Sequence, residues 1–542
     1  MQIKLKKAFL VMAVVIAALD FSAFAVAPHK GVIRVKLQPE VARQVGSKAR
    51  MRASGNMQTG ATLLDNAVES VNAVSIRPML PYSAKFAKQR AEYGLDRWYV
   101  VTFDERVTPG DARKLFAKTA GVERAELVTP MSLKEGKGKF RVLDRNAVAK
   151  ANEKLPFNDP FLGRQWHYKN FGTIPYSVAG ADINLFDAWK SVTGNKDVVV
   201  AIIDGGIDYN HEDLAANVLI NEKELNGTPG VDDDGNGYVD DVYGWNFCTN
   251  EPKIHPHQHG THVAGTVGAV SNNGIGVAGV AGGDGTPGSG VKMLSCQVFD
   301  SRQGTGDGDF AAALVYAAER GASIAQCSWG WDAVGYYEQA VLDAIDYFTD
   351  KAQSPVMKGG LCIFAMGNTG ETGDFYPGVY DRVIGVTAMT SELTPAPYSS
   401  NSPKADITAP GGLLDFGDAQ GVLSTLPNNT YGASEGTSMA TPHVSGIAAL
   451  VLSKYGSPDF LNETLRTQLL TSVNDFYGYG NNSSVAYNFG TGYIDAAKAV
   501  TMNREGHPET IKDFDLQAAQ DYISVTWTIP ASSDNNVNSH VA

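Results

Sequence analysis

Cysteine is scarce in this chain, with four residues among 542. This count excludes a small scaffold held together by disulfides, and a chain of this length can bury a large apolar core without them. Cys296, Cys327 and Cys362 lie in apolar runs typical of buried strands. Because a buried thiol behaves as a small hydrophobe, we expect unpaired core cysteines, with disulfides as the alternative.

An excess of positive charge is also missing. Lysine and arginine number 45 against 58 aspartates and glutamates, so the net charge is -13. This balance disfavours nucleic acid and anionic membrane surfaces as partners. Beyond the first 25 residues no apolar run is long enough to span a bilayer. We expect a monomeric globular protein without a membrane span.

The first residues have the features of an export signal. Lysines at positions 4, 6 and 7 precede an apolar stretch at residues 8–19, and Ala-Phe-Ala follows at 23–25. A positive start, a short apolar core and a small-x-small pattern are those of a secretory signal peptide. We assign residues 1–25 to such a signal and expect a secreted, extracellular or cell-surface protein. A short buried helix is the alternative.

Residues 26–155 form a first unit, rich in lysine, arginine and alanine. Residues 97–104 alternate as a strand does, and residues 108–120 begin with Thr-Pro and continue with helical spacing. Residues 122–128 can form the next strand. The pattern predicts a small α+β domain.

Residues 156–503 form the largest region, in which apolar runs alternate with helical segments at 310–320 and 336–348. Continuous runs rich in β-branched residues are typical of parallel strands covered on both faces. The alternation predicts an α/β fold with a mostly parallel central sheet and helices on both faces. The runs lie at residues 197–203, 291–298, 322–327 and 361–365.

Residues 504–542 differ again in character. Residues 522–528 alternate as a strand and resemble the start of a fibronectin type III-like sandwich. Forty residues cannot complete such a sandwich. Either the sequence stops inside that domain, or the segment packs on the preceding one.

Three short motifs place polar residues where chemistry is expected. Ile-Ile-Asp-Gly-Gly puts Asp204 at the end of an apolar run, His-Gly-Thr-His begins at His259, and Gly-Thr-Ser-Met-Ala puts Ser438 at a predicted helix start. Singly, each fits a turn, a structural histidine or a helix cap. Together, in the order Asp, His, Ser, they match one of the chain orders of the serine-hydrolase triad.

With a fourth segment, Ala-Met-Gly-Asn at 365–368, these motifs resemble the subtilisin-like serine proteases (subtilases, peptidase S8) of the bacterial secreted type with a propeptide. The resemblance covers about residues 159–500. It implies a subtilisin-like three-layer fold and a serine endopeptidase acting on proteins or peptides. It also implies that residues 26–155 are a propeptide, an intramolecular inhibitor and folding aid, released by a cut between Val148 and Asp159.

The resemblance gives each motif residue a role. A serine hydroxyl is a weak nucleophile, so His259 would take the proton of Ser438 as that oxygen attacks. Asp204 would hold the imidazole in the required tautomer. The Asn368 side-chain amide and the Ser438 backbone N–H would stabilise the negative oxygen that forms.

Substrate binding is expected on Ser328, Trp329 and Gly330, which follow a predicted strand and resemble the family segment that pairs with the substrate backbone. A plain strand exit is the alternative. The short path from Asn368 to Pro377 lacks the acidic pattern of the proprotein convertases. We therefore expect a broad, mainly apolar preference rather than cleavage at paired basic residues.

Calcium is the expected cofactor. An acidic loop alternates oxygen-bearing side chains with glycine at the sixth position, as in the first half of an EF-hand loop. The twelfth position is Tyr243, where that motif has glutamate; Asp241 could substitute, and an acidic turn without metal is the alternative. The predicted ligands are Asp232, Asp234, Asn236, the Tyr238 carbonyl and Asp240. The resemblance implies a second site at Asp159, Asp213 and Asn273, with backbone oxygens near Ile275 and Val277.

Three other functions are alternatives to a subtilisin-like protease. Histidines 255, 257, 259 and 262 suggest zinc, but a metalloprotease has glutamate after the first histidine of the pair, where Gly260 stands. A catalytically inactive subtilisin-fold binding module would need a defect that the intact motifs do not reveal. A serine hydrolase of small esters or amides would have a Gly-x-Ser-x-Gly elbow, which is missing around Ser438.

Overall fold

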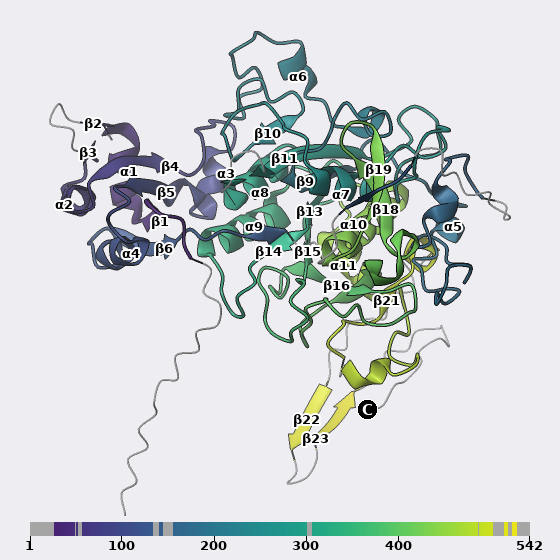
Figure 1. Cartoon of the computed structure of the whole chain (residues 1–542). Helices are drawn as coiled ribbons and strands as arrows, with labels where there is room; N and C mark the ends of the chain where they lie inside the picture. The colour runs from purple at the N-terminus through teal and green to yellow at the C-terminus, as the bar shows by residue number, and fades with distance from the viewer. Residues whose placement is uncertain are drawn as a thin grey trace, which may run out of the picture.

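The computed structural model describes residues 27–48, 50–51, 57–133, 140–144, 155–300, 306–485, 487–501, 514–518 and 523–527. The predicted signal segment, residues 1–25, lies outside this range. A small N-terminal domain, purple in Figure 1, lies against one side of a larger α/β domain.

The N-terminal domain is an antiparallel sheet covered by helices on one face. Its strand order is β4-β5-β1-β6. Thr108 begins α4 as predicted, because its hydroxyl accepts a hydrogen bond from the Asp111 amide and Pro109 fills the first helical position. The strands are β1 (Val32–Leu37), β4 (Ala73–Pro78), β5 (Trp98–Phe103) and β6 (Val122–Leu127), with the short pair β2 (Arg50–Met51) and β3 (Met57–Gln58). The helices are α1 (Pro39–Lys48), α2 (Thr62–Ser70), α3 (Ala87–Glu92) and α4 (Pro109–Ala117).

The larger domain is built on a ten-stranded sheet whose main path runs β10-β11-β9-β13-β15-β16-β17-β21-β20, with β12 attached to β11. The pairs from β10 to β21 are parallel; the β20–β21 and β11–β12 pairs are antiparallel. The predicted mostly parallel sheet is therefore confirmed. Its strands are β9 (Val199–Gly205), β10 (Gly244–Asn246), β11 (Lys292–Asp300), β12 (Gly306–Asp307), β13 (Ile324–Cys327), β15 (Leu361–Ala365), β16 (Val383–Met389), β17 (Ile407–Pro410), β20 (Val473–Asn474) and β21 (Tyr493–Ile494).

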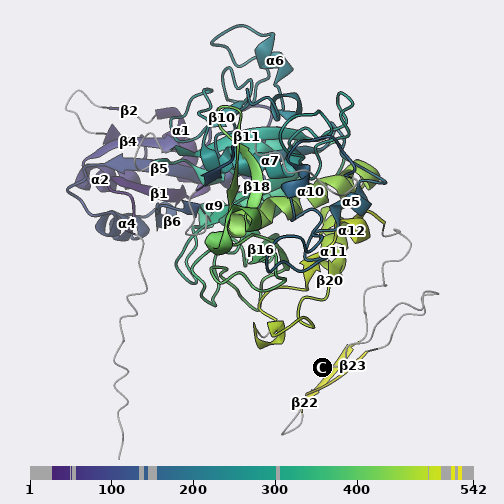
Figure 2. The same ribbon diagram turned by 45° about the vertical axis from the view of Figure 1, so that its right-hand side comes forward.

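Helices cover both faces of this sheet, as Figures 1 and 2 show. Successive side chains of a strand point to opposite faces. Val200 and Ile202 of β9 accordingly join the apolar core that contains α7 (Gln258–Gly268) and α10 (Thr437–Tyr455). Ala201 and Ile203 join the core under α8 (Phe310–Glu319) and α9 (Gln339–Lys351). The remaining helices are α5 (Leu185–Ala188), α6 (Glu222–Leu225), α11 (Asn462–Thr471) and α12 (Ala496–Thr501).

Apolar packing joins the two domains. Met79, Leu80 and Trp98 of the N-terminal domain belong to the same buried cluster as α8 and α9. The N-terminal sheet therefore uses one face for its own core and the other for the larger domain. Burial of this kind contributes roughly 25 cal/mol per Å² of apolar surface.

Buried charges add to the same contact. Arg90 binds Glu319 through two hydrogen bonds of 2.7 and 2.6 Å, a paired geometry that favours arginine and carboxylate. Arg34 donates to Glu338 at 2.8 Å, and Glu126 accepts the backbone N–H of Gln339 at the start of α9. Such interactions also fix the orientation of the two domains, because a displaced domain would leave these charges buried and unpaired.

Two segments of the N-terminal region lie on short strands of the larger domain. β7 (Ser132–Leu133) pairs antiparallel with β14 (Trp329–Gly330). β8 (Arg141–Val142) pairs with β19 (Thr430–Ser434), which in turn pairs with β18 (Val422–Leu426). The N-terminal region therefore contacts two separate strand edges of the larger domain.

The C-terminal strand predicted at 522–528 appears as β23 (Ile523–Trp527), paired with β22 (Phe514–Ala518). This hairpin, yellow in Figure 1, does not form a sandwich within the described residues. Cys296, Cys327 and Cys362 are buried free thiols, as expected. Among the described residues, no helix is long and apolar enough to cross a membrane.

Candidate active site

Asp204 and His259 meet at the carboxyl edge of the sheet. Asp204 lies near the end of β9, and its Oδ1 accepts hydrogen bonds from His259 Nδ1 at 2.7 Å and from the Gly205 amide at 2.6 Å. Both side chains are fully buried. A Cβ on Gly260 would lie 1.9 Å from the Gly205 carbonyl oxygen, so glycine is required where α7 packs on the end of β9. The motif glycines therefore allow the approach of helix and strand that brings the two side chains together.

The other histidines of the motif do not gather around a metal. His262 places Nε2 at 3.1 Å from the carbonyl oxygens of both Val422 and Gly432, and burial lowers its pKa to about 3. His257 accepts the His259 backbone N–H at the start of α7. The metal-capable cluster found among the described residues contains no histidine.

Ser438 occupies the first turn of α10, which packs against α7. Its Oγ donates to the Ser328 carbonyl at 3.0 Å, and the Ser328 hydroxyl donates to the Ser438 carbonyl at 2.9 Å. Pro442 lies four residues after Ser438 and has no N–H, so the helix cannot use that carbonyl itself. Pro442 therefore leaves the carbonyl open to Ser328 and ties the serine to the end of β13.

Asn368 carries an amide without a partner. Its Oδ1 accepts hydrogen bonds from the backbone N–H and the hydroxyl of Thr437, both at 2.9 Å, which fixes the side chain beside Ser438. Its Nδ2 is buried and has no hydrogen-bond partner among the described residues. An unsatisfied buried donor costs roughly 1–3 kcal/mol, so such a group usually has a functional reason. Here it can donate to negative charge that develops next to Ser438.

In the predicted substrate-binding segment, the backbone and the side chains have different roles. The backbone of Trp329 and Gly330 forms β14 and pairs with Leu133 and Ser132. The Trp329 side chain is fully buried, and its indole N–H donates to the Ile203 carbonyl at 2.6 Å. The segment thus accepts an added strand through its main chain, while the indole supports the strand end that carries Asp204.

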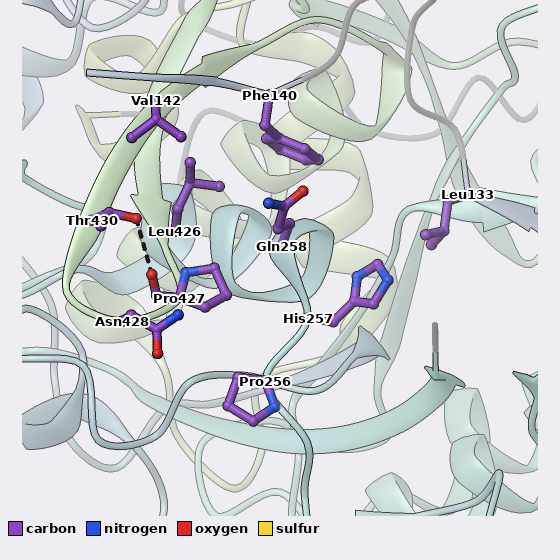
Figure 3. A pocket seen from close by; sticks show the side chains of 10 residues that line it. All are labelled: Leu133, Phe140, Val142, Pro256, His257, Gln258, Leu426, Pro427, Asn428 and Thr430. Atoms are coloured by element: carbon purple, nitrogen blue, oxygen red, sulfur yellow. Dashed lines mark hydrogen bonds between the residues drawn. The ribbon is translucent and has the colours of Figure 1, made fainter. Parts of the chain in front are cut away.

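An aromatic side chain of the N-terminal region covers the histidine. The Phe140 ring lies edge-on to the His259 ring at 6.5 Å and tilted to the His262 ring at 5.3 Å. Figure 3 shows Phe140 above a cavity of about 900 Å³ whose floor includes His257 and Gln258. The catalytic motif residues are therefore buried under a segment of the same chain.

The acidic loop at residues 232–241 folds around its own backbone, with carboxylates that accept amide N–H groups of the loop. Asp232 accepts the amide N–H groups of Gly235, Asn236 and Gly237, and Asp240 accepts that of Gly230. The carboxylate oxygens that converge, within 4.8 Å of one another, belong to Glu224, Asp234 and Asp241.

The carboxylate cluster has only partial charge compensation. Arg320 donates to Asp241 at 3.0 Å and approaches Asp234 at 3.4 Å. Three acidic side chains facing one guanidinium leave a net negative site of oxygen ligands, which fits a calcium ion. Asn236 and Tyr238 belong to the same loop, where Asn236 Oδ1 accepts the Tyr238 N–H at 2.6 Å.

The second predicted calcium site comes together in the structure. Asn273 donates through Nδ2 to Asp213 at 2.8 Å, and Asp159 accepts the Asn273 backbone N–H at 3.3 Å. Burial raises the pKa of Asp159 to about 6 and that of Asp213 well above its usual value. Among the described residues neither carboxylate forms an ion pair. Two buried acids without a cationic partner fit a divalent cation.

Two residues of these sites were missed from the sequence. Thr437 orients Asn368, yet a threonine before the serine carries no signal of that role. Glu224 accepts the amide N–H groups of Asp233, Asp234 and Asp240 from the short helix α6, outside the spacing of the loop motif. Its acidic type was the only available signal.

The family comparison agrees with this geometry. The sequence profile of the subtilase family, peptidase S8, matches residues 195–492, which is more than half of the chain. The chain therefore belongs to the subtilase family. The matched range includes Asp204, His259, Asn368 and Ser438.

Individual relatives extend the comparison. Subtilisin-like protease 1 of Plasmodium falciparum (isolate 3D7) is 31% identical over 370 residues, which cover 64% of this chain and 48% of the relative. The halolysin-like extracellular serine protease Nep of Natrialba magadii is 30% identical over 346 residues, which cover 64% of this chain and 53% of the relative. The chain thus spans about half the length of these curated relatives.

Among solved structures, fervidolysin from Fervidobacterium pennivorans, described as a keratinolytic enzyme related to subtilisin, superposes with a TM-score of 0.57 at 21% identity. The match covers 89% of this chain and 62% of that chain. At this identity the likeness establishes the subtilisin-like α/β fold alone.

Proposed function

We propose that this chain is a serine endopeptidase that hydrolyses peptide bonds through an acyl-enzyme intermediate. The observation that carries the proposal is the unpartnered Asn368 amide, held by Thr437 beside Ser438 while Asp204 binds His259 at 2.7 Å. A donor kept dry and unsatisfied next to a serine matches the demand of acyl transfer, in which charge develops on the carbonyl oxygen.

The proposed reaction gives each of these residues one role. Ser438 Oγ attacks the peptide carbonyl carbon, and its proton passes to His259 Nε2 while Asp204 retains the Nδ1 proton. The Asn368 amide and the Ser438 backbone N–H bind the oxyanion, with the N-terminal dipole of α10 adding positive potential. His259 then gives the proton to the leaving amine. Water, deprotonated by the same imidazole, hydrolyses the acyl-enzyme and restores the Ser438 hydroxyl.

The N-terminal domain is proposed to be an inhibitory propeptide. Its segment β7 lies on β14 in the position of a substrate strand, and Phe140 covers His259. With these segments in place, Asp204, His259 and Ser438 are fully buried, so an external protein cannot reach the serine. The chain would therefore be made as a zymogen that cleaves itself.

The first cut is proposed to fall between Leu133 and Phe140. Leu133 is paired with Trp329, next to the Ser328 carbonyl that binds Ser438, and Phe140 lies against the His259 ring. Both points therefore lie close to the proposed triad. This position is N-terminal to the cut expected from the sequence, between Val148 and Asp159. A cut in that second range would then be a later trimming step.

Calcium binding and export complete the proposal. Glu224, Asp234 and Asp241 would hold one calcium ion, and Asp159, Asp213 and Asn273 a second; each would tie loops of the larger domain together. Residues 1–25 would direct export, in keeping with the word "extracellular" in the name of the Natrialba relative.

A fluorophosphonate probe tests the proposed function. The self-processed chain should be labelled at Ser438, as located by peptide mapping, and should digest casein. An unlabelled serine with no hydrolysis would favour an inactive binding module. Labelling with ester cleavage but no casein digestion would favour a hydrolase of small esters or amides.

A further inference from the structure

Besides β14, a second strand edge of the larger domain binds the N-terminal region. β19 pairs with β18 along one edge and with β8 along the other. The β8 register places Arg141 opposite Ala433 and Val142 opposite Gly432, and the Leu143 N–H donates to the Tyr431 carbonyl at 2.9 Å. Once the N-terminal region leaves, this edge of β19 has backbone groups ready to bind another extended chain.

Gly432 is suited to receive a backbone. A Cβ at this position would lie 2.9 Å from the Arg141 carbonyl oxygen and 2.5 Å from Leu426 Cδ1. Glycine at this position lets Leu426 pack against one side of the β19 backbone while β8 approaches closely on the other. The edge is therefore shaped for an added strand.

A cavity of about 900 Å³ lies beside this edge. Figure 3 shows that the N-terminal region contributes apolar side chains to its lining, those of Leu133, Phe140 and Val142. The larger domain supplies Pro256, His257, Gln258, Leu426, Pro427, Asn428 and Thr430. Phe140 also contacts the rings of His259 and His262. An aromatic side chain of a substrate can therefore occupy the same place, where the cavity opens next to His259.

A basic side chain fits next to the aromatic one. Arg141 donates through Nη1 to Asp418 at 2.9 Å and through Nη2 to the Leu414 carbonyl at 3.0 Å. Both partners belong to the larger domain, so a substrate residue in the place of Arg141 would meet the same carboxylate and carbonyl. This contact is half exposed and contributes orientation more than affinity.

We propose that the β19 edge and its cavity form a binding groove for the part of a substrate that follows the scissile bond. The groove recognises an unfolded peptide with an aromatic residue at the cavity entrance and a basic residue after it. The inference rests on the proposed endopeptidase function, because β7, which lies on β14 next to Ser328, precedes the proposed cut in the chain and β8 follows it.

Peptides copied from the chain itself test the groove. The self-processed full chain, with calcium, is given peptide 128–145 or peptide 128–139, which ends before Phe140. The longer peptide should have at least a tenfold higher kcat/KM, and Phe140→Ala within it should remove most of that gain. Phe140→Leu should retain part of it.

N-methylation supplies the matched control. Methylating the Leu143 nitrogen removes the donor that binds the Tyr431 carbonyl and should lower kcat/KM about fivefold or more. Methylating Val142 should have a smaller effect, because alternate N–H groups of an antiparallel strand point away from its neighbour.

Equal rates for all peptides would overturn the groove and leave the proposed function intact, since every peptide would still be cut. If no peptide is cut and the fluorophosphonate leaves Ser438 unlabelled, the proposed function fails, and the groove inference fails with it.

Discussion

At the residue scale, the candidate site depends on side chains whose partners can be named. Asp204, His259, Ser438 and Asn368 were all found from sequence motifs, because short motifs carry chemistry directly. Their supports were not found: Thr437 fixes Asn368, and Pro442 frees the Ser438 carbonyl for Ser328. These roles come from contacts between distant segments, which no local pattern records.

Asn368→Ala is expected to lower kcat by roughly 10²–10³ while changing KM little, because the lost amide binds charge that exists mainly in the transition state. Steady-state kinetics on a peptide substrate measures the effect, with exposed Asn226→Ala as the control. A rise in KM by the same factor, with kcat unchanged, would assign Asn368 to ground-state binding of the substrate.

At the scale of elements, apolar periodicity predicted the central strands within a few residues, since buried parallel strands are continuous apolar runs. Helix ends were less accurate. The helix expected at 336–348 begins at Gln339, and Glu126 of the other domain caps its first N–H. A cap supplied from 213 residues away cannot be predicted from local sequence.

Loop ligands had the same limit. The spacing of the acidic loop predicted Asp232 and Asp240, yet these carboxylates bind backbone amides, and Glu224 from α6 joins the carboxylate cluster. The second set, Asp159, Asp213 and Asn273, did come together.

Chelation tests the two loops. Removing calcium with EDTA should lower Tm by roughly 5–10 °C. A calcium concentration of one hundred times Kd stabilises the folded protein by about 2.7 kcal/mol for each site. Asp213→Asn and Glu224→Gln should each reduce this difference, whereas exposed Asp197→Asn should not. A Tm that does not respond to EDTA in the unaltered chain would contradict both calcium sites.

The buried charges between the domains predict a pH dependence. Burial raises the pKa of Glu338 to about 7 from 4.5, against the opposing effect of Arg34; Glu126 faces it and raises the pKa further, and Asp309 pairs with the same arginine. Once the N-terminal domain leaves, Glu338 should titrate normally. The docked state therefore holds an extra proton between pH 4.5 and 7, and docking weakens as pH rises to 7.

The shift corresponds to roughly 3 kcal/mol at most. After self-cleavage, gel filtration should detect more released N-terminal domain at pH 8 than at pH 5, and Glu338→Gln should flatten the difference. Tighter retention at pH 8 in the unaltered chain would contradict this account.

At the scale of the whole molecule, a covalently attached N-terminal domain occupies the edges that a substrate would use. The domain order and its α+β class followed from composition and periodicity. The pairing of β7 with β14 and of β8 with β19 did not, because strand pairing between distant segments of the chain has no local signal.

Mass spectrometry of the processed protein tests the proposed position of the first cut. We expect a first new N-terminus between residues 134 and 140, with any trimming up to Asn158 following later in time. A single first cut between Val148 and Asp159 would contradict the proposed position of the scissile bond.

The most direct measurement compares the masses and casein hydrolysis of the unaltered chain and Ser438→Ala, expressed side by side with calcium. We expect the unaltered chain to lose its N-terminal domain and to digest casein, while the variant keeps that domain and remains inactive. If the variant is processed and hydrolyses casein at the rate of the unaltered chain, Ser438 is not the nucleophile and the proposed serine endopeptidase function is contradicted.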